Sequence, residues 1–380
     1  MRTRACELLG VEYPILAFSH CRDVVAAVTN AGAFGVLGVT ALTPEQLEID
    51  LVWIEAETRG RPFGVDVLFP ATYVGRDDDL DAAALEALIP PEHRRFVDDL
   101  LRRYDVPESS GDVTGDGDTG SMLGLALAPD RLGLLVEISL AHSIRLIANA
   151  LGPPPPDLAG RAHERDVLVA ALAGSVEHAE RNVAAGADII VAQGTEAGGH
   201  TGEIATMVLV PEVVDAVAPV PVLAAGGIAR GRQIAAALAL GAVGVWTGSV
   251  WLTTEEAETH PVVKQKMLAA TSRDTVRSRS VTGKPARQLR SAWTDEWDGV
   301  ESPGALPMPL QPLLTDDARH RIERAAYRDG SGAQQLVNYF VGQVVGSMQR
   351  VQPARRVVTE MVEELAHTML ELDAYVEHAE

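Results

Sequence analysis

The sequence predicts an α/β fold, a closed (β/α)8 barrel, because short apolar runs alternate with alanine-rich stretches of helical length. The runs are continuously apolar rather than alternating, as expected for parallel strands that are covered on both faces. An open, doubly wound sheet would need fewer strands and usually a GxGxxG motif after the first, where this chain has SHCRD. The barrel is therefore favoured. Its eight expected strands are 15–18, 33–38, 63–69, 146–151, 167–172, 188–193, 221–226 and 242–249.

Helices are expected between these runs, for example at 175–185 and 230–240, each ending near a glycine suited to a helix C-cap. We expect residues 1–270 to form the barrel, with a helical insertion at 70–132 after the third strand. Residues 271–380 leave the strand–helix pattern and are expected to form a C-terminal extension packed on the barrel. The extension should end in an amphipathic helix at about 354–377, which could serve as a homodimer contact.

Composition limits the partners and the compartment. The chain has 380 residues, 47% of them hydrophobic but only 4% aromatic, so its core must consist mainly of Ala, Val and Leu. A formal charge of −21 argues against nucleic acid and anionic membrane surfaces as partners. Two cysteines are too few for a disulfide framework, and neither a signal-peptide pattern nor a membrane-spanning apolar run is evident. We therefore expect a cytoplasmic protein.

Two glycine turns are candidates for a phosphate site. Gly226 and Gly227 follow the seventh expected strand, and Gly248 and Ser249 follow the eighth. In (β/α)8 barrels these two loops commonly bind phosphate through bare backbone N–H groups. The alternative is that the glycines only make tight turns, but their occurrence at both positions favours binding.

The segment QGTEAGGHTGE (193–203), after the sixth expected strand, is the candidate catalytic loop. Gln193 could bond a planar ring, while Gly198 and Gly199 allow close backbone approach to a flat ligand. His200 is the residue of this loop that can exchange a proton near neutral pH. Glu196 could orient His200 or line a substrate pocket. A histidine that merely caps a turn is the structural alternative.

These segments resemble nitronate monooxygenases, formerly called 2-nitropropane dioxygenases. The resemblance covers about residues 10–300 and includes QGTEAGGHTGE, PVLAAGGIARGRQ and LAATSRDTVRSRSVTGKPARQLRSAW. It implies a TIM barrel that binds FMN non-covalently and oxidises alkyl nitronates with O2. It also implies that His200 is catalytic, and that FMN is bound by Gln193, by the phosphate-site residues Gly226, Gly227, Gly248 and Ser249, and by the first-strand segment Ala17, Phe18 and Ser19.

Several positions depart from the family pattern. Phe18-Ser19-His20 stands where many members have Ala-Pro-Met, which makes His20 a further candidate for the substrate pocket. Asp66 replaces the asparagine of the family's FGVN motif and places a second titratable group near the expected flavin. Leu172-Ala173-Gly174 stands where some relatives have a lysine. These changes bear on the substrate more than on the cofactor.

Two other functions stay open at this point. One keeps the flavin and changes the reaction, giving an NAD(P)H-dependent reductase of quinones or enoyl thioesters. The other is a flavin-free barrel that binds a phosphorylated metabolite. Flavin content and the response to NADH or NADPH would separate the three.

Overall fold

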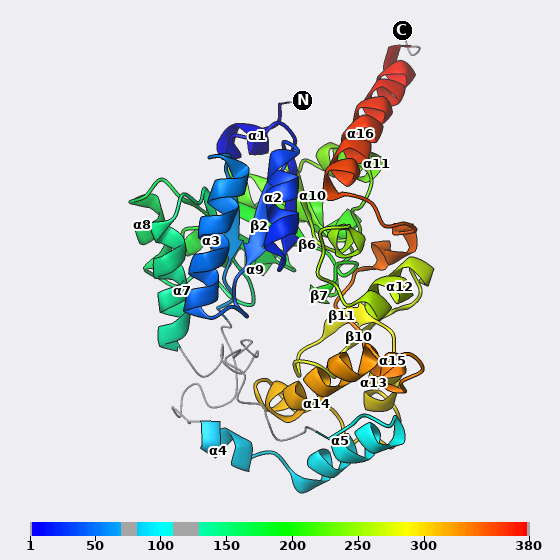
Figure 1. Cartoon of the computed structure of the whole chain (residues 1–380). Helices are drawn as coiled ribbons and strands as arrows, with labels where there is room; N and C mark the ends of the chain where they lie inside the picture. The colour runs from blue at the N-terminus through cyan, green and yellow to red at the C-terminus, as the bar shows by residue number, and fades with distance from the viewer. Residues whose placement is uncertain (1, 70–81, 109–128, 378–380) are drawn as a thin grey trace.

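A closed barrel of parallel strands forms the centre of the computed structural model, which describes residues 2–69, 82–108 and 129–377 (Figure 1). The strand order is β1-β2-β3-β4-β5-β6-β8-β9, and β1 closes on β9 with Ala17 beside Thr247. Each strand falls within or next to one of the eight apolar runs, so the predicted fold class is confirmed. The barrel strands are β1 (Ile15–Ser19), β2 (Phe34–Gly38), β3 (Gly64–Asp66), β4 (Leu146–Asn149), β5 (Leu168–Ala173), β6 (Ile189–Gln193), β8 (Val222–Ala225) and β9 (Gly244–Thr247).

The barrel is covered by an outer layer of helices. Thr43 and Ser175 each accept a backbone N–H bond at the start of a helix, which stabilises the first turns of α3 and α9. Buried Val, Leu, Ile and Ala side chains fill the space between helices and strands. The helices that accompany the barrel are α1 (Arg4–Leu9), α2 (Arg22–Asn30), α3 (Pro44–Thr58), α7 (Pro129–Ala141), α8 (Leu158–His163), α9 (Val176–Ala184), α10 (Thr206–Val217), α11 (Gly231–Ala239), η1 (Ser249–Thr253) and α12 (Pro261–Ala269).

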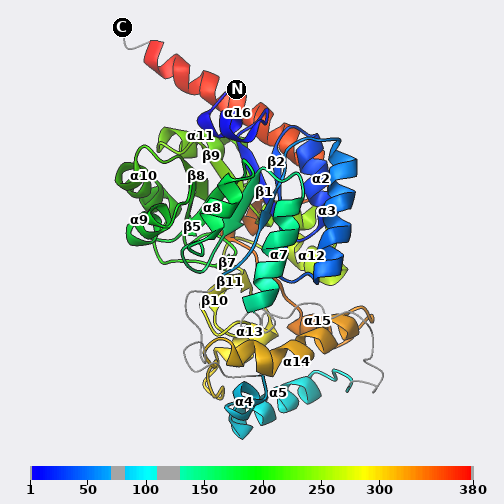
Figure 2. The same ribbon diagram turned by 90° about the vertical axis from the view of Figure 1, so that its left-hand side faces the viewer.

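The last helix, α16 (Ala354–Glu377), completes this layer. It packs against α11 and α2, the helices that follow the seventh and first barrel strands. Val358, Met361 and Leu365 are buried there in the same core cluster as the barrel strands. The C-terminal part of α16 extends past the barrel in Figure 2, and nearly all residues from 366 to 375 are exposed. The end of the extension therefore occupies the place of the eighth barrel helix.

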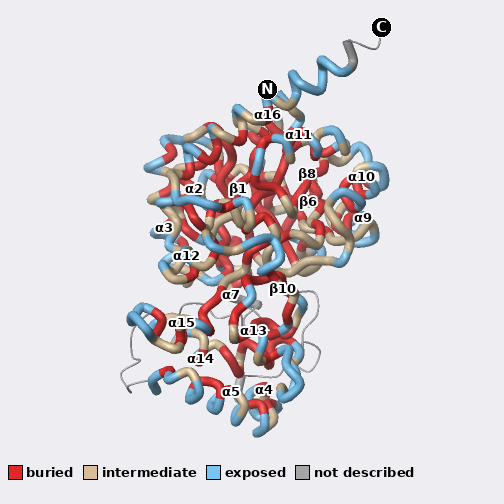
Figure 3. The backbone as a smooth tube through the Cα atoms, turned by 90° about the vertical axis from the view of Figure 1, so that its right-hand side faces the viewer, coloured by how far each residue is buried: buried red, intermediate tan, exposed pale blue. Residues whose placement is uncertain are grey.

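A second lobe lies beyond the carboxyl ends of the barrel strands (Figure 1). It combines α4 (Ala82–Ala87) and α5 (Pro91–Arg103) from the insertion with α13 (Ala292–Trp297), α14 (Leu310–Ala326) and α15 (Ala333–Leu336) from the extension. Leu100 and Val97 share one buried cluster with Trp293 and Trp297. Buried stretches of the chain, red in the lower part of Figure 3, lie among the elements of this lobe. Two parts that are far apart in the sequence thus form one hydrophobic core. Residues 70–81 and 109–128 of the insertion lie outside the described residues.

A small antiparallel sheet joins the barrel to the second lobe. Its order is β10-β11-β7, where β10 is Thr275–Ser278, β11 is Ala286–Leu289 and β7 is Gly199–His200. A short helix, η2 (Gln343–Ser347), follows the second lobe and leads towards α16. Among the described helices none has both the length and the apolar character needed to cross a membrane.

Candidate active site

A cavity of about 990 Å³ opens at the carboxyl ends of the barrel strands. Such a volume suits a cofactor and a substrate together, since ligand sites commonly have volumes of about 300–1,000 Å³. The second lobe and the segment before η2 form its outer wall. Of the predicted site residues, Ala17 alone is absent from the wall, because it is fully buried in strand β1. The others line the cavity: Phe18, Ser19, His20, Asp66, Gln193, Glu196, Gly198, Gly199, His200, Gly226, Gly227, Gly248 and Ser249.

The glycine turns leave a cradle in this wall. Gly226 and Gly227 have φ values of 97° and 72°, which L side chains rarely adopt. A Cβ atom at Gly199 would meet nothing within 4 Å, and one at Gly248 would meet only the Phe18 ring at 3.8 Å. The backbone at Gly199 and Gly248 is therefore accessible to a ligand, and Ser249 follows Gly248 directly.

Gly198 has a different role. A Cβ atom there would lie 2.8 Å from the Gly342 nitrogen and 2.9 Å from Val341. The Gly342 N–H also donates to Ser249 Oγ at 2.8 Å, which leaves the Ser249 hydroxyl proton able to donate elsewhere. The segment 341–342 thus ties the β6–α10 loop to the loop after β9. Gly198 makes room for this segment rather than for a flat ligand.

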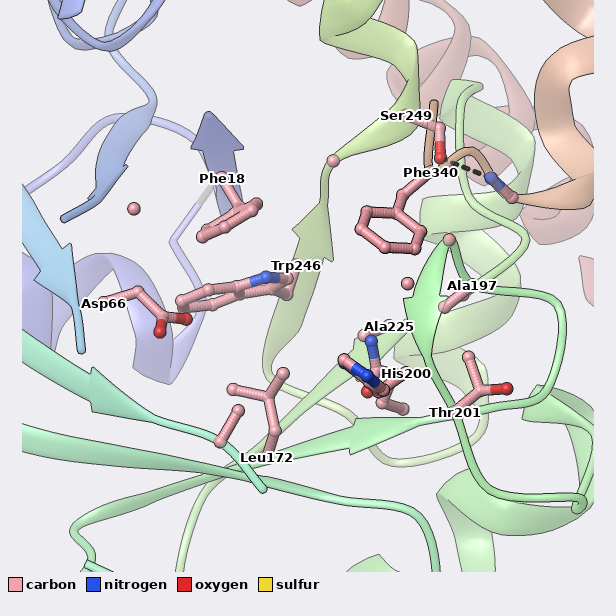
Figure 4. Close-up of a pocket in the computed structure, with 18 of the residues that line it drawn as sticks. Phe18, Asp66, Leu172, Ala197, His200, Thr201, Ala225, Trp246, Ser249 and Phe340 are labelled. Atoms are coloured by element: carbon pink, nitrogen blue, oxygen red, sulfur yellow. Dashed lines mark hydrogen bonds between the residues drawn. The ribbon is translucent and has the colours of Figure 1, made fainter. Parts of the chain in front are cut away.

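His200 belongs to β7 and is half-buried in the cavity wall (Figure 4). Its Nε2 lies 2.8 Å from Thr282 Oγ1, and its ring lies beside Phe340 with the centroids 6.3 Å apart. Burial, with a smaller contribution from the Lys284 charge, lowers the pKa of His200 to about 4. The imidazole is therefore neutral at pH 7 and can accept a proton.

Glu196 does not orient His200. Its carboxylate accepts the backbone N–H of Thr206 at 2.9 Å and the Thr206 hydroxyl at 2.9 Å, at the start of α10. A carboxylate stabilises a helix N-terminus because it satisfies free N–H groups and complements the helix dipole. Thr282, and not Glu196, lies beside the His200 imidazole.

Asp66 ends β3 inside the cavity and is only 4% exposed. Burial raises the pKa of its carboxyl to about 7. Nearby, the Phe18 ring stacks over the Trp246 indole with centroids 6.2 Å apart and an interplanar angle of 24° (Figure 4). His20 Nδ1 lies 3.1 Å from the Gly38 carbonyl, and desolvation by the atoms around the cavity lowers the pKa of His20. The cavity therefore holds two histidines that favour the neutral form and a carboxyl that titrates near neutrality.

The Asp66 pKa predicts a pH-dependent stability. Between the ordinary aspartate pKa and about 7 the folded protein binds more protons than the unfolded chain, so stability falls as pH rises through this window. The asparagine side chain in Asp66→Asn does not titrate and is uncharged over this whole pH range. We therefore expect the free energy of unfolding of Asp66→Asn to rise relative to that of the wild type. The rise should be up to about 1.4 kcal/mol per pH unit between about pH 5 and 6.5. Urea unfolding at several pH values measures this, and parallel pH profiles would contradict it.

Four important residues were not anticipated from the sequence. Trp246 lies at the end of β9, and Thr282, Lys284 and Phe340 come from the extension. In the sequence, the segment SVTGKPAR carries no signal of its own beyond the family resemblance. No local pattern reveals its position, because Thr282 reaches His200 across 82 residues through the pairing of the two-residue strand β7 with β11.

A (β/α)8 barrel with a glycine cradle and a neutral histidine in its carboxyl-end cavity defines an α/β-barrel enzyme. The chain belongs to the nitronate monooxygenase family, whose model matches residues 126–364. The resemblance stated from the sequence is thereby confirmed.

Individual proteins agree with this assignment. The chain is 64% identical to a protein of Mycobacterium tuberculosis that is provisionally named a monooxygenase, over 99% of this chain and 100% of the other. The structure of this chain is similar to that of nitroalkane oxidase from Streptomyces ansochromogenes, with a TM-score of 0.77 and 28% identity. The match covers 96% of this chain and 99% of the other. FabK from Thermotoga maritima gives a TM-score of 0.72 at 27% identity, with 99% of each chain covered.

Proposed function

We propose that the protein is an FMN-dependent nitronate monooxygenase that oxidises alkyl nitronates with O2. The observation that carries this proposal is the neutral His200 imidazole in the wall of a large cavity that also contains the glycine cradle. The family assignment and the likeness to a nitroalkane oxidase support the same chemistry.

The residues of the cavity fit FMN. Gly226 and Gly227 form a turn with positive φ values in the cavity wall, Gly248 leaves its backbone open to a phosphate, and the Ser249 hydroxyl can donate to it. Gln193 and Ser19 line the same cavity and carry polar groups suited to a planar ring. Bound FMN would take electrons from the substrate and pass them to O2.

The protein side chains have separate tasks in this proposal. His200 would take the proton from the α-carbon of a neutral nitroalkane, or hydrogen-bond a nitronate that is already ionised. The half-buried Lys284, which lines the cavity, would attract the anion, because a cation acts strongly where water is partly excluded. The second lobe would limit the access of bulk water to the reacting atoms.

The purified protein tests the proposal directly. We expect a yellow protein with a flavin spectrum that consumes O2 when propionate 3-nitronate is added and whose flavin does not bleach rapidly under anaerobic conditions with NADH or NADPH. Rapid bleaching without nitronate turnover would replace the proposal with the NAD(P)H-dependent reductase. A colourless protein that takes up no added FMN would indicate the flavin-free barrel instead.

A further inference from the structure

The partner of His200 suggests a second participant in the site. We propose that Thr282 is a positioning residue that holds the imidazole proton of His200 on Nε2 and leaves Nδ1 as the nitrogen that accepts the substrate proton. The part of this inference that concerns substrate rests on the proposed function. The part that concerns the position of the proton does not.

Thr282 is held in place by the small sheet. β11 pairs with β7 so that Ala286 lies beside His200 and Arg287 beside Gly199. This pairing brings the loop before β11 against the imidazole. The Thr282 side chain is fully buried, so its hydroxyl must find its partners among neighbouring protein groups.

The contacts of the Thr282 hydroxyl select one proton arrangement. Its Oγ1 lies 2.8 Å from His200 Nε2 and 3.2 Å from the Lys284 carbonyl oxygen, and it accepts the Lys284 N–H at 3.3 Å. If His200 Nε2–H donates to Oγ1, the hydroxyl proton can donate to the Lys284 carbonyl, and all three contacts are hydrogen bonds. If the hydroxyl donates to Nε2 instead, the Lys284 carbonyl loses this donor. The first arrangement makes three hydrogen bonds at the Thr282 hydroxyl and the second makes two, so the first is favoured.

The second ring nitrogen faces the cavity. Nδ1 of His200 makes no hydrogen bond to the described residues and is absent from the buried polar atoms that lack a partner, so it has access to the cavity. When Nδ1 accepts a proton, the bond from Nε2–H to Thr282 is unchanged. Proton transfer therefore requires no rearrangement of the supporting group.

A neutral hydroxyl fixes the imidazole without placing a charge beside it, as a carboxylate would. A carboxylate beside the imidazole would raise the His200 pKa and favour the charged form. Of the charged groups on the elements around His200, Lys284 is the one whose charge acts on its pKa. Arg287 donates to Thr195 and Thr275, while Arg277 contacts Thr201 and Glu203. Thr282 can thus fix the ring while leaving it neutral.

Nitrogen NMR of protein labelled with ¹⁵N-histidine tests the proton position without reference to turnover. We expect the His200 signals, assigned by their loss in His200→Gln, to show the Nε2–H tautomer in the wild type and in Thr282→Ser. In Thr282→Val, which removes the hydroxyl but keeps the shape, we expect a mixture of tautomers. An Nδ1–H tautomer in the wild type, or an unchanged tautomer in Thr282→Val, would overturn the proposal.

Kinetics test the link to substrate. In Thr282→Val we expect kcat for a neutral nitroalkane to fall about tenfold, part of the about 10²–10⁴ that a general base contributes, with KM little changed. Thr282→Ser should restore kcat to within about threefold, and turnover of a preformed nitronate should fall less than that of the nitroalkane. Equal losses with both substrates would exclude this role. A wild type that turns over neither substrate would refute the proposed function, while the NMR result would still decide the tautomer.

Discussion

His200→Asn is expected to lower turnover of a neutral nitroalkane by about 10²–10⁴-fold while lowering turnover of the matching nitronate much less. The imidazole is neutral at working pH because its pKa is lowered to about 4, so it can take the α-proton. Asparagine can still hydrogen-bond an anion but cannot act as a base. A preformed nitronate has already lost its α-proton and therefore does not need a base. Steady-state kinetics with both substrates measure the difference.

The control for this variant is His20→Asn. His20 also lines the cavity, but its Nδ1 is directed to the Gly38 carbonyl. We expect His20→Asn to change the ratio of nitroalkane to nitronate turnover by less than about threefold, because its imidazole is not the proposed base. FMN content should be equal in both variants and the wild type. Equal retention of both activities in His200→Asn would remove His200 from the mechanism.

The pH dependence separates the two titratable groups. A base with a pKa of about 4 is already deprotonated above about pH 5.5, so His200 should add no limb to kcat/KM near neutrality. The buried Asp66 carboxyl, with its pKa at about 7, is the group expected to titrate there. A limb near pH 7 that persists in Asp66→Asn would show that another group is responsible.

The sequence predicted the barrel well because its strands carry a local signal. Runs such as 188–193 are continuously apolar and β-branched, and the structure places β6 (Ile189–Gln193) within that run. The two loops after β8 and β9 could be located by counting strands. That is why Gly226, Gly227 and Gly248 could be placed at the carboxyl end of the barrel, where they line the cavity, without any knowledge of contacts.

The parts that escaped prediction depend on contacts between distant segments. The second lobe arises because Leu100 in the insertion and Trp293 in the extension share one core, a relation that no periodicity encodes. The sequence suggests the nearby Glu196 as the partner of His200, whereas Thr282 is brought to His200 by the pairing of a strand of only two residues. Positions 198 and 199 are both glycine, so the sequence alone does not separate them. In the structure Gly198 packs against Gly342, whereas a Cβ atom at Gly199 would meet nothing within 4 Å.

Gly231→Ala is expected to destabilise the protein by about 3 kcal/mol, because α16 must then move away from the barrel. A Cβ atom at Gly231 would lie 2.2 Å from both the Met361 carbonyl oxygen and the Leu365 nitrogen, which are backbone atoms that cannot rotate away. The displacement would also lengthen the bond from the Gly231 N–H to Glu364, now 2.8 Å. It would partly expose Val358 and its buried neighbours on α16.

Gly160→Ala is the matched control for this substitution. Gly160 lies in α8, and a Cβ atom there would meet nothing within 4 Å. Since alanine favours helix formation over glycine by about 0.5–1 kcal/mol, Gly160→Ala should leave stability unchanged or slightly raised. Urea unfolding of both variants gives the comparison. Equal midpoints for Gly231→Ala and the wild type would show that the packing of α16 does not depend on its close backbone contact with α11.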